Sequence, residues 1–343
     1  GSTAKDDLAK LADEPFVHEL LQWKDLTKTL STYVHGAGFV VREDGRVKVD
    51  WKPFTVTHRW SSSPNFQNVP EWLRRAVKAG PGWKIVGADQ SQLELRISAG
   101  LSGDKLLCEK CIYADEARKL HPDHDPHAFV AGHMFNKVYW RLVKRLYEDG
   151  DGTAKESLKQ LRGIIKTCIY GMNYGAGAAK MHEGIYKKGY DGPPITVQMV
   201  KQVVDTVFDL FGGVREWREE QLRRATADLE VRDALFGWGR FFPQHIEATI
   251  AWNYPIQSTA ASIMAISLLR LDRRLEAELP PGCVEIMAQV HDAFYLLVRE
   301  EWADKAAQIL TECMAMTLQL HPTGPAMPFV ATAKIGDDWE QVS

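Results

Sequence analysis

Two β-forming runs near the C-terminus are separated by only two residues, and this spacing constrains the fold more than any other feature of the chain. The runs cover residues 285–290 and 293–299, and apolar side chains dominate both. Two residues can join antiparallel neighbours but are far too few for a parallel crossover, so the sequence predicts a hairpin that turns at His291-Asp292. Turns of this length favour Asn-Gly or Asp-Gly. Asp292 followed by Ala293 is a poor hairpin turn, so we expect the acid to serve another purpose.

A second acid follows another predicted strand. The apolar run at 83–88 delivers Asp89, and a helix is predicted to begin immediately after it. An acid in this position often caps a helix, so Asp89 alone has two interpretations. If the sheet brings Asp89 and Asp292 together, they offer the hard oxygen ligands that Mg²⁺ prefers. Two such ions, about 3.5–4 Å apart, can activate a hydroxyl group and stabilise a departing phosphate at once.

Between the two acids lies a charge-rich stretch, from about residue 102 to residue 224, whose apolar spacing is mostly helical. Two cations and two tyrosines recur in it at intervals of four: Arg162, Lys166, Tyr170 and Tyr174. A helix places such residues in one gently drifting stripe. Phosphates suit the cations, and a base or sugar suits the rings. An amphipathic helix with long side chains lying over apolar surface would show the same pattern.

The remaining segments predict an α+β fold, in which a sheet is interrupted by the helical stretch and then resumed. Helical spacing covers 8–30, and Asp44-Gly45 indicates a turn between short strand-like runs. The further elements that we expect are strands at 38–41, 46–51, 54–56 and 329–334, a strand-forming region at 232–242, and helices at 246–279 and 302–319.

Composition excludes some classes of protein without revealing the function. No apolar run of the 343-residue chain approaches the roughly 20 residues of a membrane helix. Five cysteines in a chain of this length do not indicate a disulfide framework, and a reducing compartment fits better. The net charge is −3, so any binding of nucleic acid must use local basic surfaces. The candidates, each of which could equally be a solvated face, are Arg74-Arg75 with Lys78 and Lys84, Arg141 to Arg145, and Arg223-Arg224.

Taken together, these segments resemble the three polymerase motifs of the family A DNA polymerases, the group that contains bacterial DNA polymerase I and phage-type relatives. DQSQLELR at 89–96 resembles motif A, residues 162–175 resemble the fingers helix of motif B, and QVHD at 289–292 resembles motif C. Three more stretches agree in order: STYV at 31–34, THRWSSSPNFQNVP at 57–70 and NYPIQSTAAS at 253–262. The resemblance runs from about residue 28 to residue 339.

The resemblance implies an antiparallel palm sheet with a helical fingers insertion, in a right-hand polymerase fold that lacks most or all of the thumb. The implied divisions are a helical arm at 1–30, palm at 31–100, fingers at 101–224 and palm again at 225–343. The implied activity is template-directed DNA synthesis, which transfers dNMP from a dNTP to a primer 3′-hydroxyl with two Mg²⁺ ions and releases pyrophosphate. No proofreading exonuclease is expected in this chain.

The implied partners are primer–template DNA and dNTP, with no membrane. Either a separate chain or missing N-terminal domains would supply thumb and exonuclease. The implied location is the cytoplasm of a bacterial or phage-infected cell, with an organelle as the alternative.

The resemblance also assigns roles to residues. Asp89, Asp292 and the Gln90 carbonyl would bind metal, and Lys166 joins the two acids as a catalytic residue. The expected nucleotide contacts are Arg162, Lys166 and His127 on the triphosphate, Tyr174 at the templating position, and Glu94 as a gate against the ribose 2′-hydroxyl beside Tyr170. The expected contacts with primer, template or nascent pair are Arg59, Asn65, Gln67, Asn68, Arg240, Asn253, Gln257 and His291.

Three positions depart from the family pattern. Gln90 stands where Tyr is usual, Ala293 where Glu is common, and Ser262 where the acid of TAAD is expected. The segment 108–133 is also longer than expected and contains four residues in an order typical of zinc ligands: Cys108, Cys111, His121 and His124. We do not expect zinc there, because histidines are common in loops and the nearby His127 already has a family role.

Two other functions are compatible with this layout. A single-subunit RNA polymerase shares the arrangement of acids, but Glu94 and the stretch at 61–70 argue against it. An inactive nucleic-acid-binding scaffold need not keep both acids together with Arg162 and Lys166. Primer extension with dNTPs or rNTPs separates the three.

Overall fold

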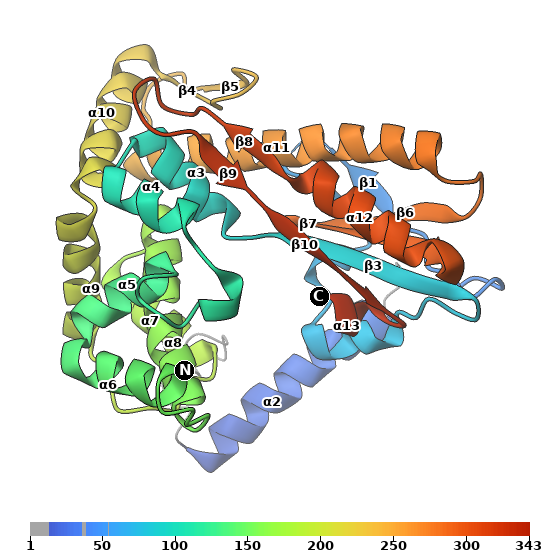
Figure 1. The fold of residues 1–343 in the computed structure, drawn as a ribbon, viewed down its shortest axis with the longest axis horizontal. Helices are drawn as coiled ribbons and strands as arrows, with labels where there is room; N and C mark the ends of the chain where they lie inside the picture. The colour runs from blue at the N-terminus through green and yellow to red at the C-terminus, as the bar shows by residue number, and fades with distance from the viewer. Residues whose placement is uncertain (1–13, 36–38, 54) are drawn as a thin grey trace.

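The computed structural model describes residues 14–35, 39–53 and 55–343, and a four-stranded antiparallel sheet lies at its centre (Figure 1). In order across the sheet, its strands are β10 (Ala331–Gly336), β3 (Trp83–Gln90), β7 (Ala293–Arg299) and β6 (Val284–Val290). The predicted hairpin is confirmed, because only two residues join β6 to β7. The sheet therefore brings together strands from residue 83 to residue 336.

The two faces of the sheet are covered differently. Val86 on β3 and Phe294 on β7 belong to the main core beneath α11 (Ala248–Glu278) and α12 (Ala303–Met314). Tyr295 on the opposite face joins a smaller cluster. That cluster includes η2 (Phe66–Asn68), η3 (Glu71–Ala76) and α13 (Trp339–Val342), and Phe66 stacks on Trp339 at 4.7 Å. The rest of this face remains open to a cleft.

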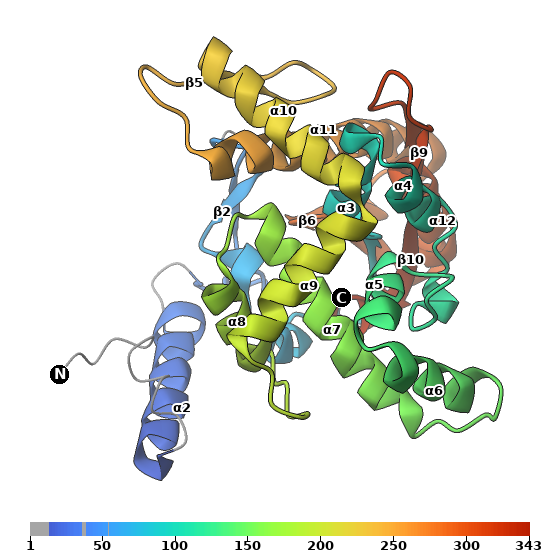
Figure 2. The same ribbon diagram turned by 90° about the vertical axis from the view of Figure 1, so that its left-hand side faces the viewer.

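The helical insertion that the sequence predicts is confirmed, and it forms a block beside the sheet (Figure 2). Its elements are α3 (Leu93–Ser102), α4 (Lys105–Ile112), η4 (Glu116–Arg118), α5 (Pro126–Met134), α6 (Asn136–Tyr147), α7 (Ala154–Asn173), α8 (Ala178–Lys187), α9 (Val197–Leu210) and α10 (Gly212–Asp228). α7 packs against α5, α6, α8 and α9, so it lies in the middle of the block. Aspartates cap two of the shorter helices: Asp104 accepts from Leu107 N at α4, and Asp125 from Ala128 N at α5.

The N-terminal region extends away from this body. The helix predicted over 8–30 is seen as α2 (Pro15–Thr29), and the part before residue 14 lies outside the described residues. α2 continues into a short π-helix, η1 (Leu30–Val34), and buries none of its residues. In the described part of the chain, no helix is long and apolar enough to cross a membrane.

Several boundaries differ from the predictions. The Asp44-Gly45 turn carries only an isolated bridge between Val41 and Val47, and 55–56 form no strand. The helix predicted to reach 319 ends at Met314, because the burial at 316–318 alternates as in a strand. Three two-stranded sheets complete the strands: β1 (Asp50–Lys52) with β2 (Ser61–Ser63), β4 (Glu230–Arg232) with β5 (Gly239–Phe241), and β8 (Met316–Leu318) with β9 (Met327–Phe329). A 3₁₀ turn, η5 (Glu300–Trp302), follows β7.

Candidate active site

The sheet brings the two acids to the same edge. Asp89 near the end of β3 is paired in register with Ala293, the residue that follows Asp292. The Gln90 amide donates to the Asp292 carbonyl over 3.0 Å. The alternative role of Asp89 as a helix cap is wrong, because α3 begins at Leu93 and its cap position is Gln92. The acids are therefore neighbours on a rigid sheet rather than parts of separate helix ends.

Both carboxyl groups are unusually basic. Burial raises the pKa of Asp292 to about 6, because the opposing attraction of Arg59 is weaker and Glu94 and Asp89 add repulsion. The Asp89 side chain reaches the cleft, where the surrounding protein removes part of its water. This desolvation raises its pKa to about 6, although the positive charges of Lys166 and Lys334 act to lower it. Nearby positive charges neutralise these two adjacent carboxylates only in part. The pair therefore suits divalent cations.

The side chains at this site can supply only some of the ligands that a metal ion needs. Among the described side chains, no three His, Cys, Asp or Glu are grouped to hold an ion, so backbone, water or phosphate oxygens would complete the coordination. The Gln90 side chain faces away from such an ion, because its Nε2 donates to the Met314 carbonyl over 2.6 Å. Any metal contact of Gln90 would therefore come from its main chain.

The four residues whose order is typical of zinc ligands have separate surroundings. Cys108 is buried in α4 and its thiol donates to the Ala99 carbonyl, and burial raises the pKa of Cys111 to about 12. The His121 ring instead contacts His124, Trp140 and Tyr147. The four residues form no metal site.

The predicted stripe lies on α7, with Tyr174 at its C-terminal end. The Lys166 ammonium lies 5.8 Å from the centre of the Tyr170 ring, and burial and the nearby Arg162 lower the pKa of Lys166. His127, at the start of α5, stacks almost parallel to Tyr170 with the ring centres 6.3 Å apart. Lys166 lies close enough to Asp89 to lower the pKa of that acid. The cationic stripe of α7 thus approaches the acids of the sheet through Lys166.

A buried carboxylate links the gate position to the acids. Glu94, only 4% exposed, accepts hydrogen bonds from Arg59 Nη2 at 2.6 Å and from the Tyr174 hydroxyl at 2.7 Å. The same Arg59 atom is 3.7 Å from Asp292 Oδ1. Burial opposes the charge of Arg59, but Asp292 and Glu94 hold its pKa above the ordinary value. One guanidinium therefore joins the gate residue to the acid pair.

The other predicted DNA contacts occupy several elements. Asn253 and Gln257 lie four residues apart on α11, and Arg240 lies on β5 with its guanidinium 4.8 Å from the centre of the Phe242 ring. His291 occupies the hairpin turn with a φ of 51°. The residues at 65–68 differ in exposure: Gln67 is buried and donates to the Gln289 carbonyl, whereas Asn65 and Asn68 are exposed and Asn68 donates to Asn65.

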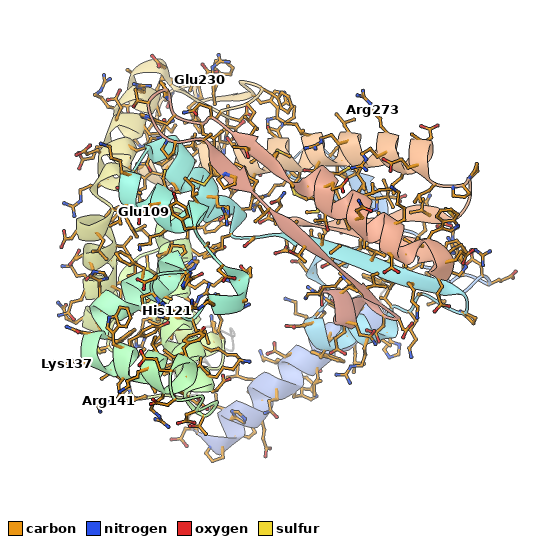
Figure 3. The ribbon with its side chains drawn as sticks, viewed as in Figure 1. Glu109, His121, Lys137, Arg141, Glu230 and Arg273 are labelled. Atoms are coloured by element: carbon orange, nitrogen blue, oxygen red, sulfur yellow. The ribbon has the colours of Figure 1, made fainter. Side chains whose placement is uncertain are left out.

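The basic clusters predicted from the sequence are largely engaged in local contacts. Arg74 lies 4.8 Å from the centre of the Trp339 ring, Arg145 pairs with Asp151, and Arg223 pairs with Glu220. Arg141 lies on α6 at the outer edge of the helical block (Figure 3). Of these residues, Arg74 lines the same cleft as Asp89 and Asp292.

Sequence reasoning missed two acids that organise the site and its surroundings. Asp125 holds Arg162 through a pair of hydrogen bonds, Nε to Oδ1 at 2.9 Å and Nη2 to Oδ2 at 2.7 Å. Asp125 precedes Pro126, a pattern that predicts a helix cap but not an arginine partner. Asp233 accepts a hydrogen bond from the Ser262 hydroxyl at 2.7 Å. Ser262, which stands where the family motif has an acid, thus contacts an acid from residue 233.

The comparisons with known proteins agree on one family. The model of the family described as "DNA polymerase family A" matches residues 1–341. The chain is 30% identical over 345 residues to "DNA polymerase I, thermostable" of Thermus aquaticus, covering 95% of this chain and 36% of that protein. It is 28% identical over 348 residues to DNA polymerase I of Chloroflexus aurantiacus, covering 96% of this chain and 33% of that protein. The chain thus spans about a third of the length of these curated relatives.

A solved structure has the same fold. The POL domain of Pol1 from M. smegmatis, in complex with DNA primer-template and dNTP, superposes with a TM-score of 0.76 at 26% identity. The match covers 99% of this chain and 57% of that one.

Proposed function

The chain belongs to DNA polymerase family A, and on that premise we propose that it is a template-directed DNA polymerase. It would transfer dNMP from a dNTP to the 3′-hydroxyl of a primer and release pyrophosphate. Primer–template DNA and dNTP are the partners that the proposal requires. Residues 31–100 and 225–343 would form the palm, and 101–224 the fingers.

One observation carries the proposal: two adjacent acids of raised pKa line a cleft of about 540 Å³, and Lys166 of the α7 stripe lies close enough to Asp89 to interact with its charge. Phosphoryl transfer needs little covalent help from a protein but much charge stabilisation and positioning. Acids that would hold metal ions, beside cations that would hold phosphates, supply both.

The residues would divide the work as follows. When bound between Asp89, Asp292 and the Gln90 carbonyl, two Mg²⁺ ions would supply the charge that favours an ionised 3′-hydroxyl and a departing pyrophosphate. Arg162, Lys166 and His127 would bind the triphosphate. Because burial lowers the pKa of Lys166, its ammonium proton is more readily shared with a pyrophosphate oxygen.

Selection of the nucleotide would involve the gate network. Glu94 would exclude a ribose 2′-hydroxyl beside Tyr170, and Tyr174 would occupy the templating position until the template base arrives. Arg59, Arg240, Asn253, Gln257 and His291 would contact primer, template or the nascent pair, with Asn65, Gln67 and Asn68 alongside. Contacts of this kind with minor-groove acceptors common to all correct pairs check geometry rather than sequence.

Primer extension tests the proposal directly. The protein is given a labelled primer–template with dNTPs or rNTPs, with Mg²⁺ or with EDTA, beside an Asp292→Asn control. Extension with dNTPs that requires Mg²⁺ and Asp292 supports it. Extension with rNTPs alone would favour an RNA polymerase, and DNA binding without extension would favour an inactive scaffold.

A further inference from the structure

Asp125 joins three parts of the structure through one carboxylate. It is fully buried, and its Oδ1 caps α5 by accepting from the Ala128 amide over 2.8 Å. Both oxygens accept from Arg162 on α7, and Oδ2 also accepts from Gln92 Nε2 over 2.8 Å. Gln92 belongs to the turn that follows β3, three residues after Asp89. The carboxylate therefore ties the helix of the proposed phosphate ligands to the turn beside the acids.

The hold on Arg162 is directional. Asp125 engages the Nε and Nη2 side of the guanidinium, so the Nη1 side is the part that points away from the carboxylate. A two-point contact fixes the plane of the group as well as its position, which a single-point contact does not. An arginine fixed in this way meets a phosphate with its donor already oriented, and less side-chain freedom is lost on binding.

Two neighbours of Asp125 carry buried polar atoms that lack a partner in the described structure. One is Nε2 of His127, a fully buried ring whose Nδ1 lies 3.6 Å from Asp125 Oδ1 and 3.4 Å from Arg162 Nη2. The other is Oε1 of Gln92. Buried polar atoms without partners are costly, and their convergence on one carboxylate points to a polar ligand that completes the group.

Asp125 stays ionised in this setting. Burial opposes its charge, but the adjacent His127 and the pair of hydrogen bonds from Arg162 hold its pKa well below the usual range. Its negative charge offsets part of the positive charge of Arg162, so the carboxylate cannot itself be a contact for an anionic phosphate. Its effect on a nucleotide must pass through the two residues it holds.

We propose that Asp125 is a positioning residue for the triphosphate: it fixes Arg162 and His127 in the orientation that receives the phosphates. The inference rests on the proposed function, because it assumes that Arg162 and His127 bind dNTP. It adds a residue that the family motifs quoted from the sequence do not contain.

The test is dNTP affinity in the absence of chemistry. Asp125→Asn keeps an oxygen to cap Ala128, but its amide nitrogen donates rather than accepts, so the two-point hold on Arg162 is lost. The dissociation constant of dNTP is measured on the complex of the full chain with a dideoxy-terminated primer–template and Mg²⁺. We expect it to rise about tenfold, the size of one charge-assisted contact. In steady-state extension KM should rise similarly and kcat should change much less.

Two further variants separate positioning from a general loss of structure. Asp104→Asn is the matched control, because Asp104 is also a buried cap acid but accepts from Leu107 N and Gly213 N instead. It should leave dNTP affinity unchanged. Arg162→Lys keeps a positive charge beside buried Asp125, and hence the fold, but a lysine ammonium cannot form the two parallel hydrogen bonds that arginine forms. Adding Asp125→Asn to Arg162→Lys should weaken dNTP binding by less than about twofold further, because both changes remove the same contact.

Each outcome decides the question. Losses that add in the double variant, an equal loss in Asp104→Asn, or wild-type affinity in Asp125→Asn would overturn the role of Asp125. If the wild-type protein binds no dNTP in this complex, the proposed function itself fails. If it binds dNTP and Asp125→Asn binds equally well, only the positioning role fails.

Discussion

Replacing Asp292 by Asn should abolish extension and, at the same time, stabilise the metal-free fold. The carboxyl pKa rises from 3.8 to about 6 on folding. A shift of about two units corresponds to about 3 kcal/mol by which ionisation opposes folding. Two effects reduce this figure: the Asp292 side chain is 25% exposed to solvent, and the variant loses the attraction of Arg59 at 3.7 Å. We therefore expect the free energy of unfolding to rise by about 1–3 kcal/mol in the variant.

The sign of the pH dependence follows from the direction of the shift. Because the folded pKa lies above the unfolded one, the penalty is absent below about pH 4, grows between about pH 4 and 6, and is constant above that. Asp292→Asn should therefore be more stable than wild type near pH 7.5 and equally stable near pH 4. Urea unfolding in EDTA at the two pH values measures this difference.

Two controls sharpen this prediction. Asp125 has a depressed pKa, so its charge stabilises the fold above the unfolded pKa, and Asp125→Asn should lose stability at neutral pH. Mg²⁺ should raise the melting temperature of wild type but not of Asp292→Asn, because binding to the folded state stabilises it. Primer–template binding should survive in Asp292→Asn. A variant no more stable than wild type in EDTA near pH 7.5 would refute the reasoning.

Three other substitutions test the gate, sugar recognition and packing. Glu94→Ala opens space where a 2′-hydroxyl would lie and removes the hydrogen-bond partner of Arg59 and Tyr174. Incorporation of rNTP relative to dNTP should therefore rise at least about tenfold in competition assays. Unchanged selectivity would contradict the gate role. Tyr170→Phe removes a hydroxyl expected to substitute for the missing 3′-hydroxyl of a dideoxynucleotide, so chain termination by ddNTPs should weaken; equal termination by both proteins would count against it. Ser262→Ala removes the hydroxyl that donates to buried Asp233 and should cost about 1–3 kcal/mol of unfolding free energy, without effect in an Asp233→Ala background.

Local patterns predicted the parts of the site that depend on short-range rules. A two-residue connection allows little besides a hairpin, and this placed Asp292 in its turn; the pairing of β3 with β7 that brings Asp89 beside it is long-range and stood only as a condition. A spacing of four places Arg162 and Lys166 on one face of any helix, and α7 has them there. Such rules need no knowledge of which elements pack together.

The contacts that orient these groups could not be predicted in the same way. Asp125 and Arg162 are 37 residues apart, and Arg59 and Glu94 are 35 apart. Each pair meets only because α5 packs on α7, or because the segment before β3 returns over α3. The hydrogen bond from Ser262 to Asp233 is of the same kind, since the motif shows the missing acid and not the distant residue that Ser262 contacts.

The shared contacts of Arg59 would couple the proposed metal site to the proposed sugar gate. Arg59 Nη2 is 2.6 Å from Glu94 and 3.7 Å from Asp292, so one guanidinium partly neutralises both acids. A cation bound at Asp292 would repel Arg59 and take over its part in neutralising that acid. Arg59 would then be held mainly by Glu94, which strengthens the charge-assisted contact that fixes the gate carboxylate. In a site built this way, binding of the metal ion would also strengthen the contact that fixes Glu94. Selection against ribonucleotides should therefore weaken when Arg59 is replaced, even though Glu94 remains.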